Sequence, residues 1–363
     1  MAIAASGAVS FSDLRTEFVG GSGAVSFSDL YRGGSNIPAK AANNLGVNLA
    51  ASVPASGTVN FTNFRNTTKG FRYTYTSGAT NQNASALFGD DYSAAFLKEI
   101  VIESGVELGA TSTADEALQI DAGGAGTITI TNNGILTGAG GAANGGAGGD
   151  AFEANVACTF INNGTIRSGG GGAGRGGNGG TGGGGRYTSL QGSARYTSAS
   201  SNGQYCSQIS GRANCPTSHG GYAYSSIYTG SCRNARDEHR CSYNCYGRRN
   251  VNVNTNGGGG GSGGNGGVGQ GYNQTNASGA GGSGGANGGT NAGRGGTGGT
   301  GGTGGLFGAN GANGNNGATG NNGNRTGGSG GAGGSGGGAA GKSIRGISNV
   351  TLTNSGTITG PQL

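Results

Sequence analysis

Residues 293–323 read GRGGTGGTGGTGGLFGANGANGNNGATGNNG, and the glycine spacing of this stretch decides the fold. Glycine stands at every third position, eleven times in succession. A period of three is that of the extended polyproline-II screw, whose backbone forms no internal hydrogen bonds. Collagen has the same period but needs abundant proline, and this stretch has none. The spacing therefore predicts polyglycine-II helices, which are left-handed extended rods that pack side by side with glycine where they touch.

The backbone of such a rod needs neighbouring rods. Its N–H and C=O groups point outward, and buried groups of this kind must find hydrogen-bond partners. Ordering each glycine costs roughly 1–2 kcal/mol, so only a cooperative lattice of lateral bonds can offset that cost. One straight rod of this stretch would reach about 95 Å, and we expect it to turn near Leu306 and Phe307 instead. Further rods would come from the glycine-rich runs 138–149, 169–185, 257–271 and 278–338.

The composition excludes a large conventional apolar core. The 363 residues include 91 glycines, 10% of the residues are charged, and tryptophan is absent. A two-domain enzyme of this length would carry far more leucine, isoleucine, valine and acid–base side chains. A flexible linker and general disorder are the alternatives to an ordered fold. Disorder usually comes with high charge and much proline, whereas this chain has low charge and four prolines. We therefore expect order.

The sequence does not point to a membrane. The N-terminus, MAIAASGAVSF, lacks the basic region and the long apolar region of a secretory signal. No apolar run approaches the roughly 20 residues that span a bilayer. We expect a soluble protein without membrane insertion.

Residues 1–70 contain one motif three times. The copies read SGAVSFSDL at 6–14, SGAVSFSDL at 22–30 and SGTVNFTNF at 56–64. Alternating apolar residues predict a short strand in each copy, followed by a helical turn that a hydroxyl residue caps. The expected caps are Ser12, Ser28 and Thr62. The apolar face of such a unit packs on itself or docks onto another subunit, and we favour docking. The docking candidates are Val9, Phe11, Leu14, Val25, Phe27, Leu30, Val59, Phe61 and Phe64.

Residues 71–138 are the most ordinary part of the chain. A short helix is expected at 94–97, and apolar stretches at 100–109, 117–120 and 127–130 are typical of strands separated by glycine turns. This pattern predicts a compact β-rich or β-solenoid unit.

A second repeat begins within this unit. It reads TITNNGILTG at 129–138, TFINNGTIRS at 159–168 and TLTNSGTITG at 351–360. Asn-Gly and Ser-Gly favour the positive φ values of a tight turn between strand residues. The wide gap before the third copy predicts that the chain leaves a β layer, makes a long excursion and returns to the same layer.

Residues 186–250 interrupt the glycine-rich region. They hold eight of the 13 tyrosines, five of the six cysteines, both histidines, and eight arginines against Asp237 and Glu238, so they carry the net charge of +6. Tyrosine and arginine are enriched at binding hot spots, with serine, glycine and asparagine as adaptable neighbours. We predict a loop that binds a partner; a disulfide-stapled loop without a binding role is the alternative. The contact candidates are Tyr187, Tyr196, Tyr205, Arg212, Tyr222, Tyr224, Tyr228, Arg233, Arg236, Arg240, Tyr243, Tyr246, Arg248 and Arg249.

Disulfides would make this segment rigid, because it has little apolar core of its own. Six cysteines allow 15 pairings, and the sequence selects none of them. A zinc site built on His239, Cys241 and Cys245 is the alternative, but paired CxxC motifs are lacking. We therefore expect neither a metal nor a cofactor. The disulfide candidates are Cys158, Cys206, Cys215, Cys232, Cys241 and Cys245.

Catalysis and nucleic-acid binding have weaker support. His219 and His239 lie near serine and cysteine, as chance allows in a polar loop, and no paired carboxylates mark a cleft. GxGxxG matches recur wherever glycine dominates, so they carry no weight without a strand and a helix around them. The lack of lysine between residues 186 and 250 argues against nucleic acid. We expect a non-enzymatic structural protein.

Two resemblances add to these patterns. The opening SGAVSFSDLRTEFVGGSGAVSFSDLYRGGSNIP, at 6–38, resembles a segment at the start of many tailed-phage fibre and tail-tip proteins. Three later stretches resemble the glycine-rich distal domains of phage tail proteins: ITITNNGILTGAGGAANGGAGGDAF at 128–152, FINNGTIRSGGGGAGRGGNGG at 160–180 and VTLTNSGTITG at 350–360. Some adhesins of this kind use a polyglycine-II sandwich whose exposed loops bind the host receptor. The segment 186–250 has no counterpart in that pattern.

The resemblance implies a protein of the phage tail, made in the host cytoplasm and carried on the virion. It implies attachment to other tail or baseplate proteins through residues 1–70, and recognition of a host protein or glycan by distal loops. Because the cytoplasm is reducing, disulfides would form only after release. A glycine-rich surface-binding or ice-binding protein is the alternative, but it does not explain the triplicated motif. A homotrimer and a monomer both remain open.

The expected fold class is mostly β and irregular, in three parts. They are an attachment region at 1–70, a β-rich connector at 71–138, and a polyglycine-II domain at 139–363 that includes the loop 186–250.

Overall fold

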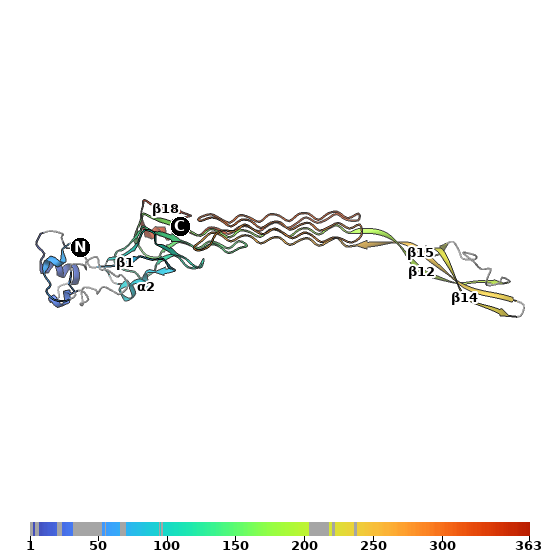
Figure 1. Cartoon of the computed structure of the whole chain (residues 1–363), viewed down its shortest axis with the longest axis horizontal. Helices are drawn as coiled ribbons and strands as arrows, with labels where there is room; N and C mark the ends of the chain where they lie inside the picture. Colours follow the sequence, from blue (N-terminus) through green and yellow to red (C-terminus); the bar gives the residue numbers. More distant parts are fainter. Residues whose placement is uncertain are drawn as a thin grey trace.

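The chain folds into an elongated molecule with four parts in succession (Figure 1). A computed structural model describes residues 3, 7–19, 24–31, 53–54, 56–65, 70–93, 95, 97–202, 218–219, 222–235 and 238–363, with the backbone alone at Phe71, Asp90 and 190–249. A small helical module is followed by a three-sided β-solenoid, a bundle of extended rods and a β-arm at the far end. The expectation of a mostly β and irregular chain is confirmed. Within these ranges, no helix is long and apolar enough to cross a bilayer.

Each copy of the first repeat forms a helical turn, so the strands expected there are wrong. The first turn, α1 (Phe11–Leu14), continues into a π-helical turn at Arg15–Val19. The other two copies form 3₁₀ turns at Phe27–Leu30 and Phe61–Phe64.

The turns begin two residues earlier than expected because of their caps. The Ser10 hydroxyl accepts a hydrogen bond from the backbone N–H of Asp13 at 3.2 Å, and the Asp13 carboxylate accepts one from the N–H of Ser10 at 2.8 Å. This reciprocal pair is a capping box. Hydrogen bonds from the side chain and then the backbone of Ser10 lower the pKa of Asp13. The caps that replace the expected ones are Ser10 for Ser12, Ser26 for Ser28 and Asn60 for Thr62.

A small apolar core lies beneath the three turns. Each turn contributes its last residue, so Leu14, Leu30 and Phe64 are fully buried. Phe18 joins them, and Ile3 and Val53 complete the cluster. The repeat therefore encodes one buried anchor per turn.

The β-solenoid is built from three sheets in which every neighbouring pair of strands is parallel. Successive coils give one strand to each sheet. The first sheet has the order β1 (Gly70–Tyr75), β4 (Leu97–Ile102), β7 (Ile128–Asn132), β10 (Cys158–Asn162) and β17 (Val350–Asn354). The second has the order β18 (Thr357–Thr359), β11 (Thr165–Arg167), β8 (Ile135–Thr137), β5 (Glu107–Gly109) and β2 (Ala79–Thr80). The third has the order β16 (Ile344–Arg345), β9 (Phe152–Ala154), β6 (Leu118–Ile120) and β3 (Gln82–Asn83).

The solenoid takes strands from both sides of residue 138, where a boundary was expected. The β9, β10, β11, β16, β17 and β18 strands all follow that residue. The helix expected at 94–97 is wrong, because Leu97 begins β4 and the helix α2 lies earlier, at Ala84–Phe88. The side chain of Asn83 caps α2 by accepting from the N–H of Ser85 at 2.9 Å. Two 3₁₀ turns lie at Gly89–Ser93 and Ile347–Asn349.

Burial alternates along the solenoid strands, as a strand with one buried face requires. Lys98, Ile100 and Ile102 of β4 are fully buried. The Lys98 ammonium donates to the carbonyl oxygen of Ala125 at 2.7 Å. Burial lowers the pKa of this lysine, and nearby Asp91 opposes the shift.

The second repeat stacks in register. Thr159 of β10 pairs with Thr129 of β7 on one side and with Thr351 of β17 on the other. The chain leaves the solenoid after β11 and re-enters it at β16. The predicted excursion and return are thus confirmed.

The glycines of this repeat are needed for close stacking instead of positive φ, so the expected turn geometry is wrong. Gly134, Gly164 and Gly356 are absent from the described residues with positive φ. A Cβ on Gly164 would lie 2.1 Å from the carbonyl oxygen of Gly134, and a Cβ on Gly356 would lie 2.1 Å from that of Gly164. Consecutive coils approach too closely there for any side chain.

Asparagines in the same repeat form a ladder through the solenoid. Asn132 and Asn162 are fully buried. The Asn132 amide donates to Asn162 Oδ1 at 2.8 Å, and the Asn162 amide donates to Asn354 Oδ1 at 2.7 Å. The ladder satisfies buried polar groups, which would otherwise destabilise the core.

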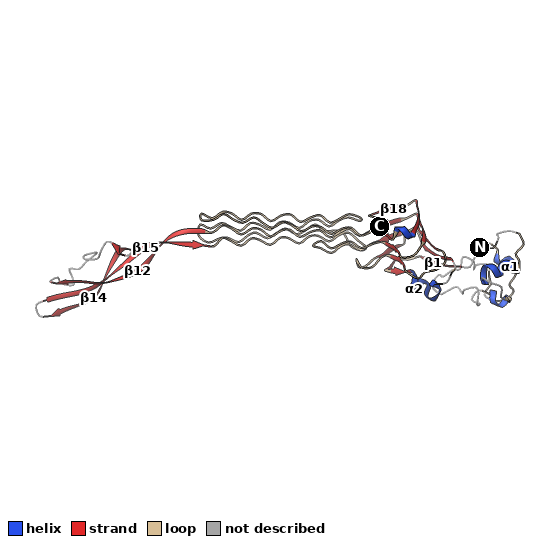
Figure 2. Cartoon of the chain, turned by 180° about the vertical axis from the view of Figure 1, so that it is seen from behind, coloured by secondary structure: helices blue, strands red, loops and turns tan. Residues whose placement is uncertain are grey.

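Six long extended rods and one short hairpin form the bundle. They have neither helix nor strand hydrogen bonding and are tan in Figure 2. The bend expected at Leu306 and Phe307 is confirmed, because the N–H of Ala309 donates to the carbonyl of Leu306 at 3.0 Å. The rods are 168–184, 257–270, 275–288, 293–305, 309–323 and 327–341, and the hairpin is 138–150.

Lateral hydrogen bonds between the rods repeat every third residue. The rod 168–184 is central: its N–H groups at 173, 176, 179 and 182 donate to rod 257–270, and those at 171, 174, 177, 180 and 183 donate to rod 309–323. Its carbonyls at 171, 174, 177, 180 and 183 accept from rod 293–305, and those at 169, 172, 175, 178 and 181 accept from rod 327–341. One rod therefore bonds to four others, and its backbone groups are satisfied without an apolar core.

The Tyr/Arg/Cys-rich segment is an antiparallel β-arm, which corrects the expectation of a loop. The strands β12 (Gly185–Asn202) and β15 (Glu238–Thr255) pair along their length and continue two of the rods. Tyrosine, threonine and valine favour this extended pairing. On the other side of β15 lie β14 (Tyr222–Ala235) and then β13 (Ser218–His219).

Candidate functional site

The two groups of candidate residues lie at opposite ends of the long axis (Figure 1). The N-terminal module is at one end and the β-arm at the other, with the solenoid and the rods between them. Each end is therefore free to meet a different partner.

Three phenylalanines, one from each copy of the first repeat, form a triangle on the N-terminal module. The ring centroids of Phe11 and Phe27 are 4.8 Å apart, those of Phe11 and Phe61 5.2 Å, and those of Phe27 and Phe61 5.8 Å. All three pairs are edge-to-face, the arrangement that the ring quadrupoles prefer. Phe11 is 40% exposed and Phe27 is 38% exposed. Exposed apolar side chains grouped in this way are typical of a protein–protein interaction surface.

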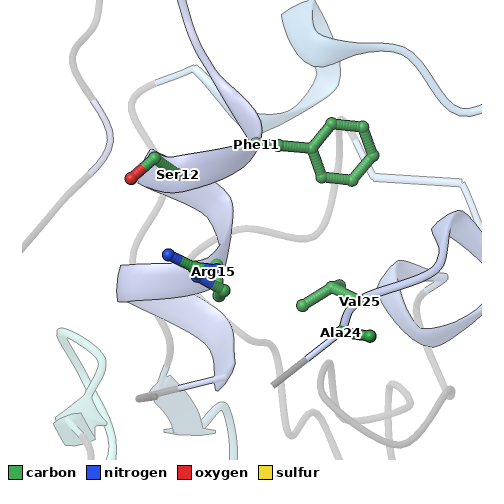
Figure 3. Close-up of a pocket in the computed structure, with 5 residues that line it drawn as sticks. All are labelled: Phe11, Ser12, Arg15, Ala24 and Val25. Carbon is green, nitrogen blue, oxygen red and sulfur yellow. The ribbon is translucent and has the colours of Figure 1, made fainter. Parts of the chain in front are cut away.

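A pocket of about 220 Å³ lies beside the triangle, between the first two copies (Figure 3). Phe11 and Val25 line its apolar side, and Ser12 and Arg15 add polar groups. The docking candidates Val9, Val25, Val59 and Phe61 are partly buried around the core. Leu14, Leu30 and Phe64 are fully buried, so they support this surface from beneath.

The arm holds most of the predicted contact residues. Of these, Tyr187 is half-buried, and the other side chains lie outside the described part. Arg233 of β14 stands directly opposite Arg240 of β15. The strand β12 holds Tyr187 and Tyr196; β14 holds Tyr222, Tyr224, Tyr228 and Arg233; β15 holds Arg240, Tyr243, Tyr246, Arg248 and Arg249; Tyr205, Arg212 and Arg236 lie outside the described residues.

Cys158 lies in β10 as a free thiol, which corrects its place among the disulfide candidates. It is buried in the apolar core of the solenoid, and burial raises its pKa to about 11. Cys232 stands opposite Cys241 in the register of β14 and β15, and Cys245 stands opposite Ile227. Cys206 and Cys215 lie outside the described residues.

The zinc alternative at His239, Cys241 and Cys245 falls on side chains outside the described part. Among the described side chains, no group of three metal-binding residues is found.

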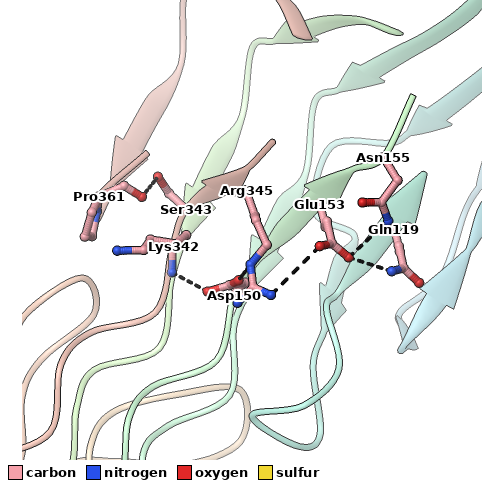
Figure 4. A network of polar contacts seen from close by, with 8 residues as sticks. All are labelled: Gln119, Asp150, Glu153, Asn155, Lys342, Ser343, Arg345 and Pro361. Carbon is pink, nitrogen blue, oxygen red and sulfur yellow. Dashed lines mark hydrogen bonds and ion pairs between the residues drawn. The ribbon is translucent and has the colours of Figure 1, made fainter. Parts of the chain in front are cut away.

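A polar network closes the solenoid where the rods return to it (Figure 4). Asp150, which is 4% exposed, forms an ion pair with Arg345 and accepts from the backbone N–H of Lys342. Arg345 also lies 3.9 Å from the carboxylate of Glu153. Burial, followed by the nearby charge of Glu153, raises the pKa of Glu116 to about 7. The network joins the two ends of the excursion.

Sequence reasoning missed the polar residues at the base of the arm. Arg186, Asn252, Asn291, Asn324 and Arg325 line one pocket together with Tyr187. The available signal was the replacement of glycine by Asn and Arg at the rod ends, 291 and 324–325, where the period of three stops.

Comparison with known proteins finds one family model that is similar to part of the chain. Residues 70–235 match the family model of the phage tail fibre adhesin Gp38. The chain is a receptor-binding protein of a phage tail, and we refer to it as the adhesin. The matched range covers most of the solenoid, the central rod and much of the arm, so the predicted resemblance to phage tail proteins is confirmed.

One solved structure and no curated protein were found for the adhesin. The structure is described as the gp37-gp38 adhesin tip complex of the long tail fibre of bacteriophage S16. The similarity has a TM-score of 0.34 and 16% sequence identity, and it covers 85% of this chain and 88% of that chain. No curated protein matches the adhesin.

Proposed function

We propose that this adhesin is held on the phage tail by its N-terminal module and binds the host cell with its β-arm. The adhesin is a structural protein of the tail that serves host-receptor recognition. The assignment of attachment to one end and host binding to the other rests on one observation. The two candidate surfaces are separated by the full length of the solenoid and rods (Figure 1). One end can stay with the particle while the other reaches a cell.

The arm has a composition and a formal charge that suit a receptor-binding element. Tyrosine and arginine supply most of the energy at many interfaces. Arg233 stands opposite Arg240 in the register of β14 and β15. Residues 186–250 carry eight arginines against two acidic residues, so we propose a receptor with anionic groups on its surface.

We also propose that the rods are polyglycine-II helices that act as a rigid spacer. The three-residue repeat of their lateral hydrogen bonds supports this assignment. Steric limits support it too: a Cβ on Gly176 would lie 2.0 Å from the carbonyl oxygen of Gly299, and a Cβ on Gly263 would lie 1.8 Å from that of Gly176. A spacer bonded on several sides would transmit force from the arm to the tail without bending.

Deletion of the arm tests its proposed role in binding. Residues 191–248 are replaced by a two-residue Asn-Gly turn, which leaves the first residues of β12 paired with the last of β15. We expect particles that assemble normally and carry the adhesin, but adsorb to host cells no better than particles without it. Unchanged adsorption would refute the assignment.

The phenylalanine triangle is the proposed attachment surface. Three equivalent apolar side chains from three sequence repeats suit a tail-fibre end that presents three equivalent positions. The partly exposed rings would gain free energy from burial, at roughly 25 cal/mol per Å² of apolar surface. This role explains why the motif is repeated, which an ice-binding function does not.

A charge placed in the triangle tests the attachment proposal. Phe27→Asp would put a carboxylate against two aromatic rings and desolvate it on docking. We expect particles that lack the adhesin, as detected by immunoblotting of purified virions. The matched control is Thr113→Asp, at an exposed position of the solenoid. If Phe27→Asp particles carry the adhesin at the wild-type level, attachment occurs elsewhere.

A further inference from the structure

We propose that the pocket at the base of the β-arm binds an acidic sugar, one that carries a carboxylate or a phosphate. The inference deepens the proposed host-binding function, on which it rests, by naming a class of ligand and a site for it. The site is separate from the arm strands 191–248, whose side chains the preceding proposal uses.

The pocket is built by two rod turns and the first residues of the arm. The turn at 289–292 contains Asn291, which has a φ of +59°, and the turn at 323–326 contains Asn324. The amides of Asn291 and Asn324 donate to the backbone carbonyl of Arg186 at 3.2 and 2.7 Å. Asn324 Oδ1 also accepts from the N–H of Arg186 at 2.7 Å. Both turns therefore hold the backbone of Arg186 in place.

The pocket has the size of a small-molecule site. Its volume is about 840 Å³, which falls in the usual range for such sites. The rods and the base of the arm are fixed by backbone hydrogen bonds, so the site exists before a ligand arrives. Its lining includes Arg186, Tyr187, Asn252, Asn291, Asn324 and Arg325.

The pocket is positively charged and lacks a compensating acid. Arg186 and Arg325 are both exposed, and no carboxylate of the described residues forms an ion pair with either guanidinium. The sequence has no acidic residue after Glu238, which lies about 46 Å from Asn252 along β15 at roughly 3.3 Å per residue. Arg186 Nε donates to Asn254 Oδ1 at 3.2 Å, which orients the guanidinium.

These groups match an anionic sugar better than a neutral ligand. A guanidinium binds carboxylate and phosphate oxygens through paired hydrogen bonds, which a neutral sugar cannot replace. The half-buried Tyr187 ring offers a flat apolar surface to the C–H face of a sugar ring. The exposed amide of Asn252 can both donate to and accept from hydroxyl groups.

Binding to the purified full chain tests the proposal, with two pairs of probes. Tetragalacturonate is compared with its methyl ester, and glucose 6-phosphate with glucose, by calorimetry or ligand-observed NMR at low ionic strength. We expect at least one acidic probe to bind at least tenfold more tightly than its neutral partner, and the two pairs distinguish a carboxylate from a phosphate ligand. The preference should shrink as salt rises.

Substitutions assign the binding to this pocket. Arg186→Gln and Arg325→Gln should each weaken binding of the acidic probe roughly tenfold, the usual effect of losing a charged hydrogen bond. Arg186→Lys should keep part of the preference, since it keeps the charge. The matched control is Arg175→Gln, an exposed arginine on the rod 168–184 that leads into β12, about 34 Å from Arg186 at roughly 3.1 Å per residue.

Equal binding of the acidic and neutral probes would overturn the inference, and so would an equal loss in Arg175→Gln and Arg186→Gln. The unfolding midpoint of each variant confirms that it folds. These measurements use purified protein and no cells. A negative result would overturn the pocket proposal alone, whereas unchanged adsorption after deletion of the arm would overturn the proposed host-binding function.

Discussion

At the scale of single residues, glycines in the rods are not equivalent. A Cβ on Gly179 would lie 2.1 Å from the carbonyl oxygen of Gly296 and would clash with backbone that cannot yield. A Cβ on Gly281 would have no atom within 4 Å. Both belong to the same type of rod, so contact with a neighbouring backbone, and not the local sequence, decides which glycine is required.

An alanine substitution at each position tests this distinction. Gly179→Ala should destabilise the adhesin by about 2–3 kcal/mol, because overpacking forces rods apart. Gly281→Ala should be neutral or stabilise by up to about 0.5 kcal/mol, since alanine restricts the unfolded chain. Denaturant unfolding followed by circular dichroism measures both. Equal losses in the two variants would contradict the lateral packing of the rods.

Glu116 makes the stability of the solenoid depend on pH. Burial raises the pKa of this carboxyl to about 7 from an unfolded value near 4.5. The folded state therefore binds more protons between these two values, and the contribution of the group to stability is lost as pH rises through about 7.

Glu116→Gln removes this titration. Because the carboxyl is partly exposed and screened by solvent, we expect the substitution to raise the free energy of unfolding at pH 8 by only about 1 kcal/mol. At pH 4 the carboxyl of the wild-type protein is mostly protonated and therefore neutral like the glutamine, so the difference in the free energy of unfolding should vanish. Thermal unfolding at the two pH values measures the difference, and a gain that is the same at pH 4 and pH 8 would show that the carboxyl does not titrate as described.

At the scale of elements, the register of the arm selects one disulfide among the pairings that the sequence left open. Cys232 and Cys241 are directly opposite in β14 and β15. Opposed residues in antiparallel strands have Cα atoms about 4.5–5.5 Å apart, within the range that a disulfide spans. We predict a Cys232–Cys241 disulfide that forms under oxidising conditions. Each thiol loses a proton, and the two electrons reduce an external disulfide such as oxidised glutathione to two thiols.

Peptide mapping without reduction measures this bond directly. Particles exposed to oxidised glutathione should yield the Cys232–Cys241 linked peptide, and Cys232→Ser should abolish it. The bond would close a short hairpin, so its removal should lower the stability of the arm by about 2 kcal/mol. The control is Cys158→Ser, in the solenoid core, which should leave the linked peptide in place. A dominant link between other cysteines would contradict the register.

The rods could be predicted from the sequence because their period is local. Glycine at every third residue predicted extended segments, and the interruption at Leu306 and Phe307 predicted one bend, but the turns at 289–292 and 323–326 within the run 278–338 were not predicted. The prediction of strands in the first repeat was wrong. The capping box of Ser10 and Asp13 favours a helical turn more strongly than three residues of apolar alternation favour a strand. The prediction of positive φ at the Asn-Gly turns was wrong. Their glycines allow close contacts between coils, and a single copy of the repeat does not reveal such contacts.

At the scale of the whole molecule, the pocket at the base of the arm could not be predicted. Arg186, Asn291 and Arg325 are far apart in the sequence, and only the antiparallel return of the rods brings them together. By contrast, the phenylalanine triangle, which is the proposed attachment surface, could be anticipated, since its three phenylalanines occupy one position of a visible repeat. Repetition reveals which residues share an environment, whereas unique residues at the ends of rods give no such signal.

The last coil of the solenoid closes the molecule. The chain that leaves after β11 returns to the solenoid in β16, β17 and β18, which complete the three sheets. Arg345 then pairs with Asp150, which would otherwise be a buried charge without a partner. Closing the excursion costs chain entropy, and we expect the contacts of this last coil to offset part of that cost.

Truncation after Gly341 therefore should loosen the rods that return last, although it removes none of their residues. We expect the amide protons of 309–341 to exchange with solvent at least tenfold faster than in the full chain, as measured by hydrogen–deuterium exchange and mass spectrometry. The matched comparison is the replacement of residues 191–248 by a turn, which removes more of the chain but keeps the last coil. That variant should retain full protection in the same rods, because their lateral hydrogen bonds and the solenoid remain. If the truncated chain also keeps its protection, the rods are stable by their own lateral bonds and the closing coil is dispensable.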